Sequence, residues 1–196
     1  TDEVHLSYSS PKTPGRTYLY NLQSKERKLL KEQEIPSGHN SDDYIVERLE
    51  CSSHDNRLIP ITITRHKNTP VDGSANLLLY GYGSYGSSMT PNFSSTRLSL
   101  IGRDIIWVTA HIRGGMEKGM KWWKEGKLLN KKNTFEDYIA VAKFLIEKKY
   151  TSKGKIIGMG GSAGGLLMGA VVNKNPELFK GIVMAVPFVD SLTTNL

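Results

Sequence analysis

Short apolar runs, separated by glycine-rich turns and by segments with helical spacing, dominate the chain from residue 76 onward. The runs occupy residues 76–80, 104–110, 156–159 and 181–187. Continuous apolar runs of this length are typical of strands buried on both faces of a parallel sheet. Residues 92–101 and 135–149 instead repeat apolar side chains at helical spacing. Strands that alternate with helices predict an α/β fold with a mostly parallel sheet and right-handed crossovers.

The beginning of the chain has a different pattern, in which apolar and polar residues alternate around turns. Residues 4–10 and 16–22 flank a Pro-Lys-Thr-Pro-Gly turn and predict a β-hairpin. Because two strands alone are only marginally stable in water, we expect this hairpin to belong to a larger sheet. Residues 31–43 are polar and predict a linker, after which residues 44–50 and 58–65 predict a second strand pair.

One strand-to-helix junction carries recognisable chemistry. The apolar run at 156–159 is followed by Gly-Gly-Ser-Ala-Gly at 160–164, which matches the G-x-S-x-G nucleophile elbow. Small neighbours allow Ser162 to lie at the tip of a strained turn, because larger side chains would collide with the adjacent strand or helix. The same turn directs the backbone N–H of Ala163 toward a developing oxyanion. The alternatives are a plain tight turn and a phosphate-binding loop, but no Gly-Lys-Ser/Thr sequence follows the glycines.

Composition narrows the class of protein. A hydrophobic content of 38% and a charged content of 23% are typical of a globular protein and not of a disordered one. No apolar run is long enough to span a membrane. The single cysteine, Cys51, excludes an internal disulfide and favours a reducing compartment, so we expect a structural thiol and a cytoplasmic location. We expect no cofactor, and no metal site because no two His or Cys residues have ligand spacing.

The net charge of +7 permits an anionic partner without requiring one. Much of the positive excess lies between residues 118 and 132, where lysines alternate with tryptophans and a glutamate. We interpret this segment as a solvated lysine-rich face. Because no recognised nucleic-acid-binding motif accompanies the charge, we expect neither a nucleic-acid partner nor a membrane partner.

Five motifs resemble, in order and spacing, those of the prolyl oligopeptidase family. They are Tyr-Gly-Tyr-Gly-Ser-Tyr-Gly at 80–86, Arg-Gly-Gly at 113–115 with Glu117, Asn-Thr-Phe-Glu-Asp at 133–137, the elbow at 160–165 and Val-Pro-Phe-Val-Asp at 186–190. The Ser-Tyr-Gly and Gly-Gly-Ser-Ala-Gly-Gly forms resemble the oligopeptidase B (protease II) branch in particular. The resemblance implies a partial α/β-hydrolase fold preceded by the last part of a β-propeller. Residues 1–35 would end the propeller and form the linker, and residues 36–196 would be the N-terminal part of the catalytic domain.

The resemblance also implies an activity, namely cleavage of short peptides after Arg or Lys by a serine peptidase that forms an acyl-enzyme. Ser162 would be the nucleophile, while the Tyr82 hydroxyl and the Ala163 N–H would form the oxyanion hole. Tyr85 and Phe188 would line the pocket for the residue before the scissile bond. For Tyr82, Tyr85 and Phe188, packing in the core is the alternative interpretation.

The chain departs from the family pattern where the catalytic triad should be completed. An α/β-hydrolase places its acid and then its histidine after the nucleophile, but only Glu177 and Asp190 follow Ser162 and no histidine does. We expect the missing acid and histidine from a C-terminal segment beyond this chain, supplied in cis or in trans together with the rest of the propeller. We interpret His111 as a packing residue and Asp190 as a loop residue.

The acids that would hold a substrate Arg or Lys are likewise expected downstream. Bacterial members of the family often carry a further acidic pair in the loop after Ser-Tyr-Gly, where this chain has Thr90 and Asn92. This difference argues against an additional subsite for basic residues. Two other functions stay open: an inactive truncated or split-gene remnant, and an acyl-peptide hydrolase or esterase on the same fold.

Overall fold

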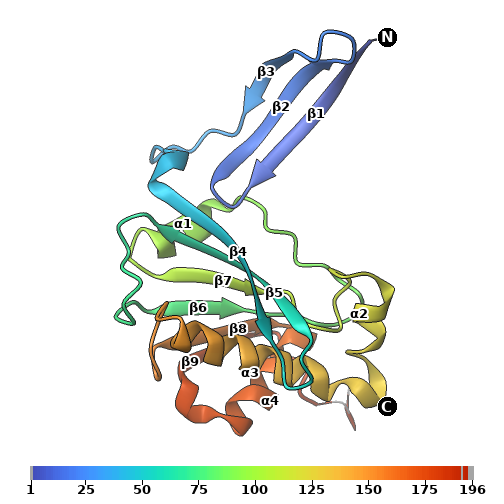
Figure 1. The fold of residues 1–196 in the computed structure, drawn as a ribbon, viewed down its shortest axis with the longest axis vertical. Coiled ribbons are helices and arrows are strands. Elements are labelled where there is room, and N and C mark those ends of the chain that lie inside the picture. The colour runs from blue at the N-terminus through green and yellow to red at the C-terminus, as the bar shows by residue number, and fades with distance from the viewer. Residues whose placement is uncertain (1, 191, 194–196) are drawn as a thin grey trace.

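The computed structural model describes residues 2–190 together with residues 192 and 193. Two sheets make up the chain, a three-stranded sheet at the N-terminus and a six-stranded sheet that contains the remaining strands. The small sheet projects from one end of the larger body, as Figure 1 shows. One connecting segment, which includes the short 3₁₀ turn η1 (Ser41–Asp43), joins the two sheets.

The small sheet is an antiparallel meander of β1 (Glu3–Ser10), β2 (Thr13–Asn21) and β3 (Arg27–Glu32). The predicted hairpin is confirmed, but the sequence did not predict β3, and the predicted linker begins too early. All six residues of β3 are exposed, so the strand has no alternation of buried and exposed positions that a sequence pattern could reveal. Its ladder with β2 holds it in place, together with an ion pair between Arg16 and Glu32 at 2.9 Å.

The large sheet has the strand order β4-β5-β7-β6-β8-β9. Its strands are β4 (Tyr44–Ser52), β5 (Leu58–His66), β6 (Leu77–Tyr80), β7 (Ile106–Ala110), β8 (Ile156–Gly161) and β9 (Phe179–Ala185). The first two strands pair antiparallel, and β5 also runs antiparallel to β7. The remaining pairs are parallel. The predicted α/β fold with a mostly parallel sheet is therefore confirmed.

Helices cover both faces of this sheet. The α3 helix (Lys132–Glu147) and the α4 helix (Ala163–Lys174) pack on one face and enclose the main core with β6, β7 and β8. The α1 helix (Ser95–Ile101) lies on the opposite face, where the Arg97 guanidinium is 4.7 Å from the centre of a Trp107 ring. The short α2 helix (Met120–Lys124) and the 3₁₀ turn η2 (Leu128–Asn130) belong to the connection between β7 and α3, and η3 (Pro176–Leu178) precedes β9.

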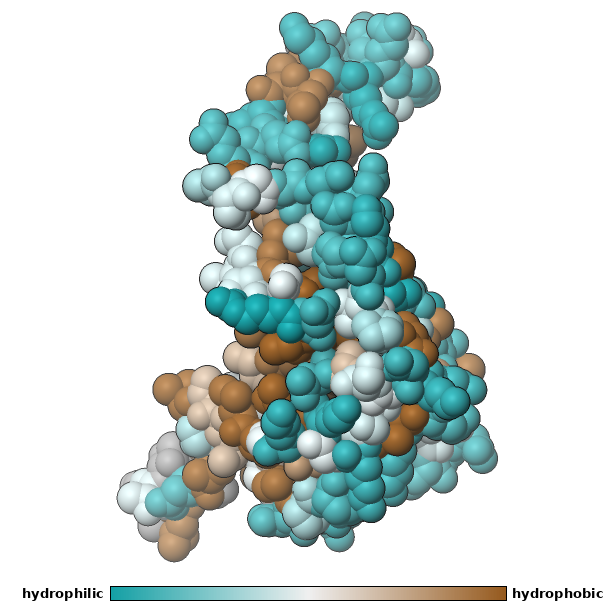
Figure 2. Space-filling model, turned by 90° about the vertical axis from the view of Figure 1, so that its left-hand side faces the viewer, coloured by the Kyte–Doolittle hydropathy of each residue, from teal (hydrophilic) through white to brown (hydrophobic). Residues whose placement is uncertain are grey.

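The environment of the last strand differs from the predicted one. The apolar run at 181–187 predicts a strand buried on both faces, yet β9 lies at the edge of the sheet and pairs with β8 alone among the described strands. Val183 and Met184 are each 44% exposed. Figure 2 shows apolar residues gathered on the lower part of the molecule, whereas the projecting small sheet above is largely hydrophilic. Phe179 and Ile182 pack against the main core, but Val183 and Met184 do not belong to it, so the strand is not buried on both faces within the described residues.

The single cysteine lies at the end of β4 inside the main core. Cys51 is 3% exposed, and burial raises the pKa of its thiol to about 12. A thiol with a raised pKa carries little thiolate and reacts slowly. This environment agrees with the structural role expected for Cys51.

Candidate active site

Ser162 occupies a strained position between the end of β8 and the first residue of α4. Its backbone has φ 54° and ψ −119°, a conformation that is costly for a residue with a Cβ. Its N–H donates to the Ala185 carbonyl at 2.9 Å, and its carbonyl accepts from the N–H groups of Gly165 at 2.8 Å and Phe188 at 2.9 Å. These three bonds fix the turn, and the Ser162 side chain is exposed at its tip. The sharp turn predicted at this position is present.

The glycines of the elbow allow the close approach of backbones around this turn. A Cβ added to Gly160 would lie 2.7 Å from the carbonyl carbon of Gly164. One added to Gly165 would lie 2.5 Å from the Cα of Pro187. Real Cβ atoms do not approach backbone this closely, so the first turn of α4 reaches its place only because these positions lack side chains.

The loop that carries Tyr82 begins beside the elbow. Tyr80 pairs with Met159 in the parallel register of β6 and β8, and the Gly81 N–H continues the ladder to the Met159 carbonyl at 3.1 Å. A Cβ on Gly164 would lie 2.9 Å from the Gly81 carbonyl oxygen and 3.5 Å from the Tyr82 Cα. The half-buried Tyr82 therefore follows a backbone that packs directly on the first turn of α4.

A pocket of about 470 Å³ opens next to the elbow. Tyr85, Ala163 and Phe188 all line it, as do Trp123 and Leu128 from the segment before α3. Tyr85 is 76% exposed, which excludes the core-packing alternative for this residue in the described chain. The structure thus brings together the predicted site residues on one edge of the sheet, at the carboxyl ends of its parallel strands.

The charged groups in this pocket are cations. Lys127 and Lys131 line it, and no carboxylate does among the residues that the structure describes. The Lys127 amine lies 3.7 Å from the centre of a Trp123 ring, in a cation–π arrangement. Thr90 and Asn92 leave the loop beyond Tyr85 uncharged at those two positions.

A buried ion-pair cluster, which the sequence analysis did not identify, supports the loops of the site from below. Arg113 is 1% exposed, and its guanidinium donates to both carboxylate oxygens of Asp137, at 2.6 and 2.8 Å. It also donates to Asp55 at 2.6 and 3.1 Å. The Asp137 carboxylate also accepts hydrogen bonds from the Arg113 backbone N–H at 3.0 Å and from the Ser53 hydroxyl at 2.6 Å. Burial by itself would lower the pKa of Arg113, but the two carboxylates outweigh it and raise this pKa.

The segment that follows Arg113 forms the base on which the Tyr82 loop lies. The Gly86 N–H donates to the Gly114 carbonyl at 2.9 Å, and the Thr134 hydroxyl donates to the Arg113 carbonyl at 2.8 Å. Gly83 has φ +65°, and a Cβ there would lie 2.9 Å from the Arg113 carbonyl oxygen. Packing of this kind holds the Tyr82 loop against the Arg-Gly-Gly segment with little freedom to shift.

Lys131 is the other functional candidate that the sequence analysis missed. Its amine donates to the Gly83 carbonyl at 2.5 Å and to the Ser84 hydroxyl at 2.8 Å. Burial lowers the pKa of this amine to about 8. The solvated lysine-rich face predicted for residues 118–132 is therefore correct for exposed members such as Lys118 and Lys124 but wrong for Lys131. Nothing in the local sequence separates Lys131 from its neighbours, because its acceptors lie far away in the chain.

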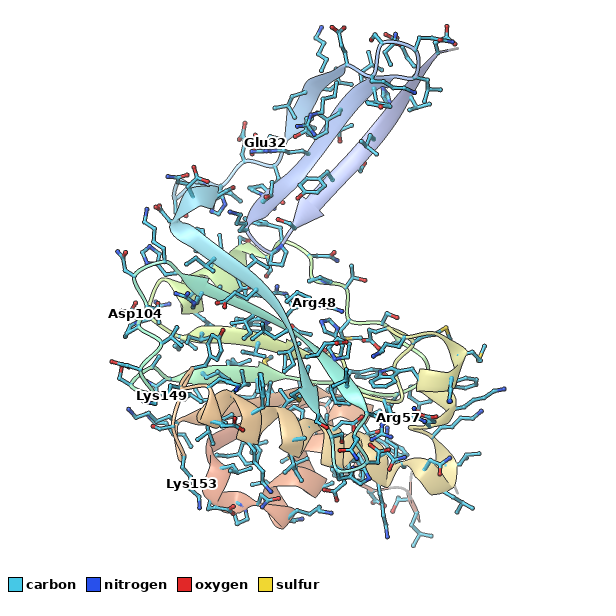
Figure 3. The ribbon with its side chains drawn as sticks, in the orientation of Figure 1. Glu32, Arg48, Arg57, Asp104, Lys149 and Lys153 are labelled. Atoms are coloured by element: carbon cyan, nitrogen blue, oxygen red, sulfur yellow. The ribbon has the colours of Figure 1, made fainter. Side chains whose placement is uncertain are left out.

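His111 has the packing environment expected of it. It is 1% exposed, and its Nε2 lies 2.8 Å from the Thr62 hydroxyl and 3.0 Å from a guanidinium nitrogen of Arg48. Arg48 reaches it from β4, on the antiparallel side of the sheet (Figure 3). No side chain within residues 2–190, 192 and 193 forms a hydrogen bond with the Ser162 hydroxyl. Asp190 accepts a hydrogen bond from the Thr193 N–H at 3.0 Å, as expected of a loop residue.

The described residues contain neither a membrane-spanning helix nor a metal-binding cluster. In that part of the chain, no helix is both long and apolar enough to cross a membrane. Nor does any group of three or more His, Cys, Asp or Glu side chains there have an arrangement that could hold a metal ion.

An exposed serine on a strained strand-to-helix turn, at the carboxyl edge of a mostly parallel sheet, defines the class of α/β-hydrolase folds. Comparison with known families gives a narrower assignment. The model of the prolyl oligopeptidase family matches residues 91–196, which is more than half of the chain. The chain therefore belongs to the prolyl oligopeptidase family, as its motifs predict.

Individual relatives agree with this assignment. The chain is 48% identical to dipeptidyl aminopeptidase BI of Pseudoxanthomonas mexicana and 45% identical to protease 2 of Moraxella lacunata, in both cases over its whole length. It covers 27% and 28% of those two proteins. The solved structure of oligopeptidase B from Leishmania major matches 99% of the chain with a TM-score of 0.91 and 42% identity, and the chain covers 27% of it.

Proposed function

We propose that the protein carrying this chain is a serine oligopeptidase that hydrolyses short peptides through an acyl-enzyme on Ser162. The observation that carries the proposal is the exposed Ser162 on a strained turn, beside both the Tyr82 loop and the pocket of Tyr85 and Phe188. A nucleophile, an oxyanion site and a side-chain pocket at one sheet edge are the parts that acyl transfer requires.

Each residue has a defined part in the proposed reaction. The Ser162 Oγ attacks the carbonyl carbon of the scissile bond while a histidine takes its proton. The Tyr82 hydroxyl and the Ala163 N–H donate to the resulting oxyanion. Collapse of the tetrahedral intermediate breaks the C–N bond, and the histidine returns the proton to the leaving amine. Water, activated by the same histidine, then attacks the ester and releases the acid and Ser162.

We infer that the histidine and its orienting acid come from a segment outside this chain, in cis or in trans. His111 is unsuitable as the base because it is only 1% exposed and contacts Thr62 and Arg48, with no hydrogen bond to the Ser162 hydroxyl among the described residues. In this proposal residues 36–196 are the N-terminal part of the catalytic domain. Residues 1–35 are the last part of a β-propeller and its linker. Their exposed, antiparallel β1-β2-β3 meander is consistent with a piece of a larger sheet.

We further propose that the residue before the scissile bond lies between Tyr85 and Phe188 and is Arg or Lys. Aromatic walls suit the aliphatic stem of such a side chain, while its charge requires a carboxylate. Because the described lining contributes Lys127 and Lys131 instead, that carboxylate is expected from the same segment that supplies the histidine. The single cysteine is consistent with a reducing, cytoplasmic location.

Covalent labelling with an organophosphonate serine probe tests the proposed function directly. We expect the complete, folded protein to gain the mass of one adduct, and trypsin to release that adduct on the peptide from residues 156 to 174. Ser162 is the only hydroxyl-bearing residue in this peptide, so the mapping identifies the nucleophile. Protein unfolded before labelling serves as the control. A folded protein that takes up no adduct, or takes it up on another peptide, contradicts the proposal and favours the inactive remnant.

The oxyanion role of Tyr82 gives a separate expectation. Tyr82→Phe removes one donor and keeps the ring, so kcat is expected to fall by about 10²- to 10³-fold, as for other oxyanion donors. The measurement is steady-state hydrolysis of a peptide amide that ends in arginine. Tyr80→Phe is the matched control, because Tyr80 stacks on Trp107 at 6.2 Å between ring centres, on the α1 face of the sheet. Equal activity of the two variants would refute the role assigned to Tyr82.

A further inference from the structure

The Lys131 amine is the side-chain donor that joins the beginning of α3 to the loop between Tyr82 and Tyr85. It contacts Gly83 and Ser84, the two residues that separate those tyrosines. Lysines such as Lys67 and Lys174 form ion pairs with carboxylates at the surface. Lys131 instead directs its charge at a neutral backbone carbonyl and a hydroxyl inside the protein.

This arrangement has a desolvation free-energy cost that a fully solvated lysine does not have. Removal of an ammonium group from water is unfavourable unless hydrogen bonds replace its hydration. The Gly83 carbonyl and the Ser84 hydroxyl supply two such bonds, and Ser84 is only 8% exposed. No backbone N–H of the described chain donates to the Gly83 carbonyl, so Lys131 also satisfies a group that would otherwise lack a partner.

We propose that Lys131 is a positioning residue that holds the Tyr82 loop, and through it the Tyr82 hydroxyl, at the oxyanion site. The inference rests on the proposed function, because it assigns Lys131 a part in that same reaction. Lys131 touches neither the nucleophile nor Tyr82 itself. It acts through the carbonyl of Gly83, the residue that follows Tyr82.

The backbone around Gly83 explains why one amine has this influence. Gly83 has φ +65° and Tyr85 has φ 56°, so two of the three residues that follow Tyr82 have left-handed backbone. Below Gly83, Ile112 and Arg113 prevent movement in one direction, since a Cβ at Gly83 would lie 2.8 Å from the Ile112 Cγ1. From the α3 side, the Thr134 side chain packs against Gly83, and Lys131 adds hydrogen bonds to the Gly83 carbonyl and the Ser84 hydroxyl. Packing prevents large movements of the loop, so without Lys131 we expect only a small rotation of the Gly83–Ser84 peptide. A displacement of about 1 Å at the Tyr82 hydroxyl is nevertheless enough to reduce the rate about 100-fold.

A double-mutant cycle on the complete protein tests this inference. Lys131→Met removes the amine and keeps the chain length, and it is expected to lower kcat by about 10- to 100-fold toward a peptide amide that ends in arginine. In a Tyr82→Phe background, the same substitution is expected to cost less than about 3-fold, because the hydroxyl that Lys131 positions is then absent. Lys132→Met is the matched control: Lys132 is the next residue, is exposed, and is expected to retain full activity.

Each outcome of the cycle is decisive. Equal costs of Lys131→Met with and without the Tyr82 hydroxyl would overturn the inference, as would full activity of Lys131→Met. If Lys131→Met does not fold by circular dichroism, Lys131→Gln, which keeps one donor group, replaces it in the same cycle. Failure of the proposed function is distinguishable, because it would appear already in the parent protein, either as no activity or as activity that does not depend on Ser162.

Discussion

If the proposed function is right, replacing Ser162 with alanine is expected to lower the kcat of the complete protein by a factor on the order of 10⁶, as in a serine peptidase that loses its nucleophile. The physical reason is that alanine cannot form the acyl-enzyme, so only attack by water remains. The proposed oxyanion donors and substrate pocket persist in the variant, so we expect a residual rate about 10³- to 10⁴-fold above the uncatalysed reaction. This expectation depends on the nucleophile elbow and not on which substrate side chain the pocket binds.

The measurement is steady-state hydrolysis of a short peptide amide that ends in arginine, with active-site titration to exclude contaminating wild-type protein. Ser152→Ala is the matched control, since Ser152 lies in the turn before β8. Its backbone carbonyl accepts a hydrogen bond from the Lys155 N–H, and the substitution leaves this bond in place. A Ser162→Ala protein that retains more than about 1% of parental turnover would exclude Ser162 as the nucleophile.

Replacing Asp137 with asparagine is expected to reduce the free energy of unfolding by about 3–5 kcal/mol, because it leaves a buried charge only partly paired. Asp137 is fully buried and accepts from the guanidinium, from the Arg113 N–H and from Ser53. An asparagine keeps one acceptor oxygen and turns an N–H₂ group toward these donors. Asp55 would then be the sole anion beside Arg113, and it is itself partly exposed.

Urea-induced unfolding, followed by tryptophan fluorescence, measures this loss because all three tryptophans lie in the part of the chain around Arg113. The neighbouring Glu136→Gln is the matched control. Glu136 forms a surface ion pair with Lys174, and its loss is expected to cost less than about 1 kcal/mol. If Asp137→Asn proves as mild as Glu136→Gln, the cluster does not stabilise the base of the site.

The sequence predicts well those features in which each residue acts on its immediate neighbours. The glycine spacing around Ser162 predicts the elbow because the turn, its tight contacts and the helix that follows lie within about ten residues. The alternation of apolar runs with helical segments predicts the parallel sheet for the same reason. Local patterns fail at β3, whose residues are all exposed, and at β9, whose apolar residues lie at a sheet edge.

At the Tyr82 loop, local sequence patterns give only part of the structure. Its tyrosines and glycines are visible in the sequence, and the resemblance to the prolyl oligopeptidase family assigns Tyr82 and Tyr85 to a site. The supports of the loop are not visible. The contact of Lys131 with Gly83 joins residues 48 positions apart, and that of Arg113 with Asp55 joins residues 58 positions apart. No periodicity or spacing rule extends over such separations.

By itself, then, the sequence determined the α/β class, the elbow at Ser162 and the membership of the prolyl oligopeptidase family, because local backbone requirements and ordered motifs carry that information. The tertiary structure alone decided which polar residues are buried. It placed Arg113 between Asp137 and Asp55, and it removed Lys131 from the solvated face. The physical reason is that the environment of a charged side chain depends on partners that only folding brings within hydrogen-bonding distance.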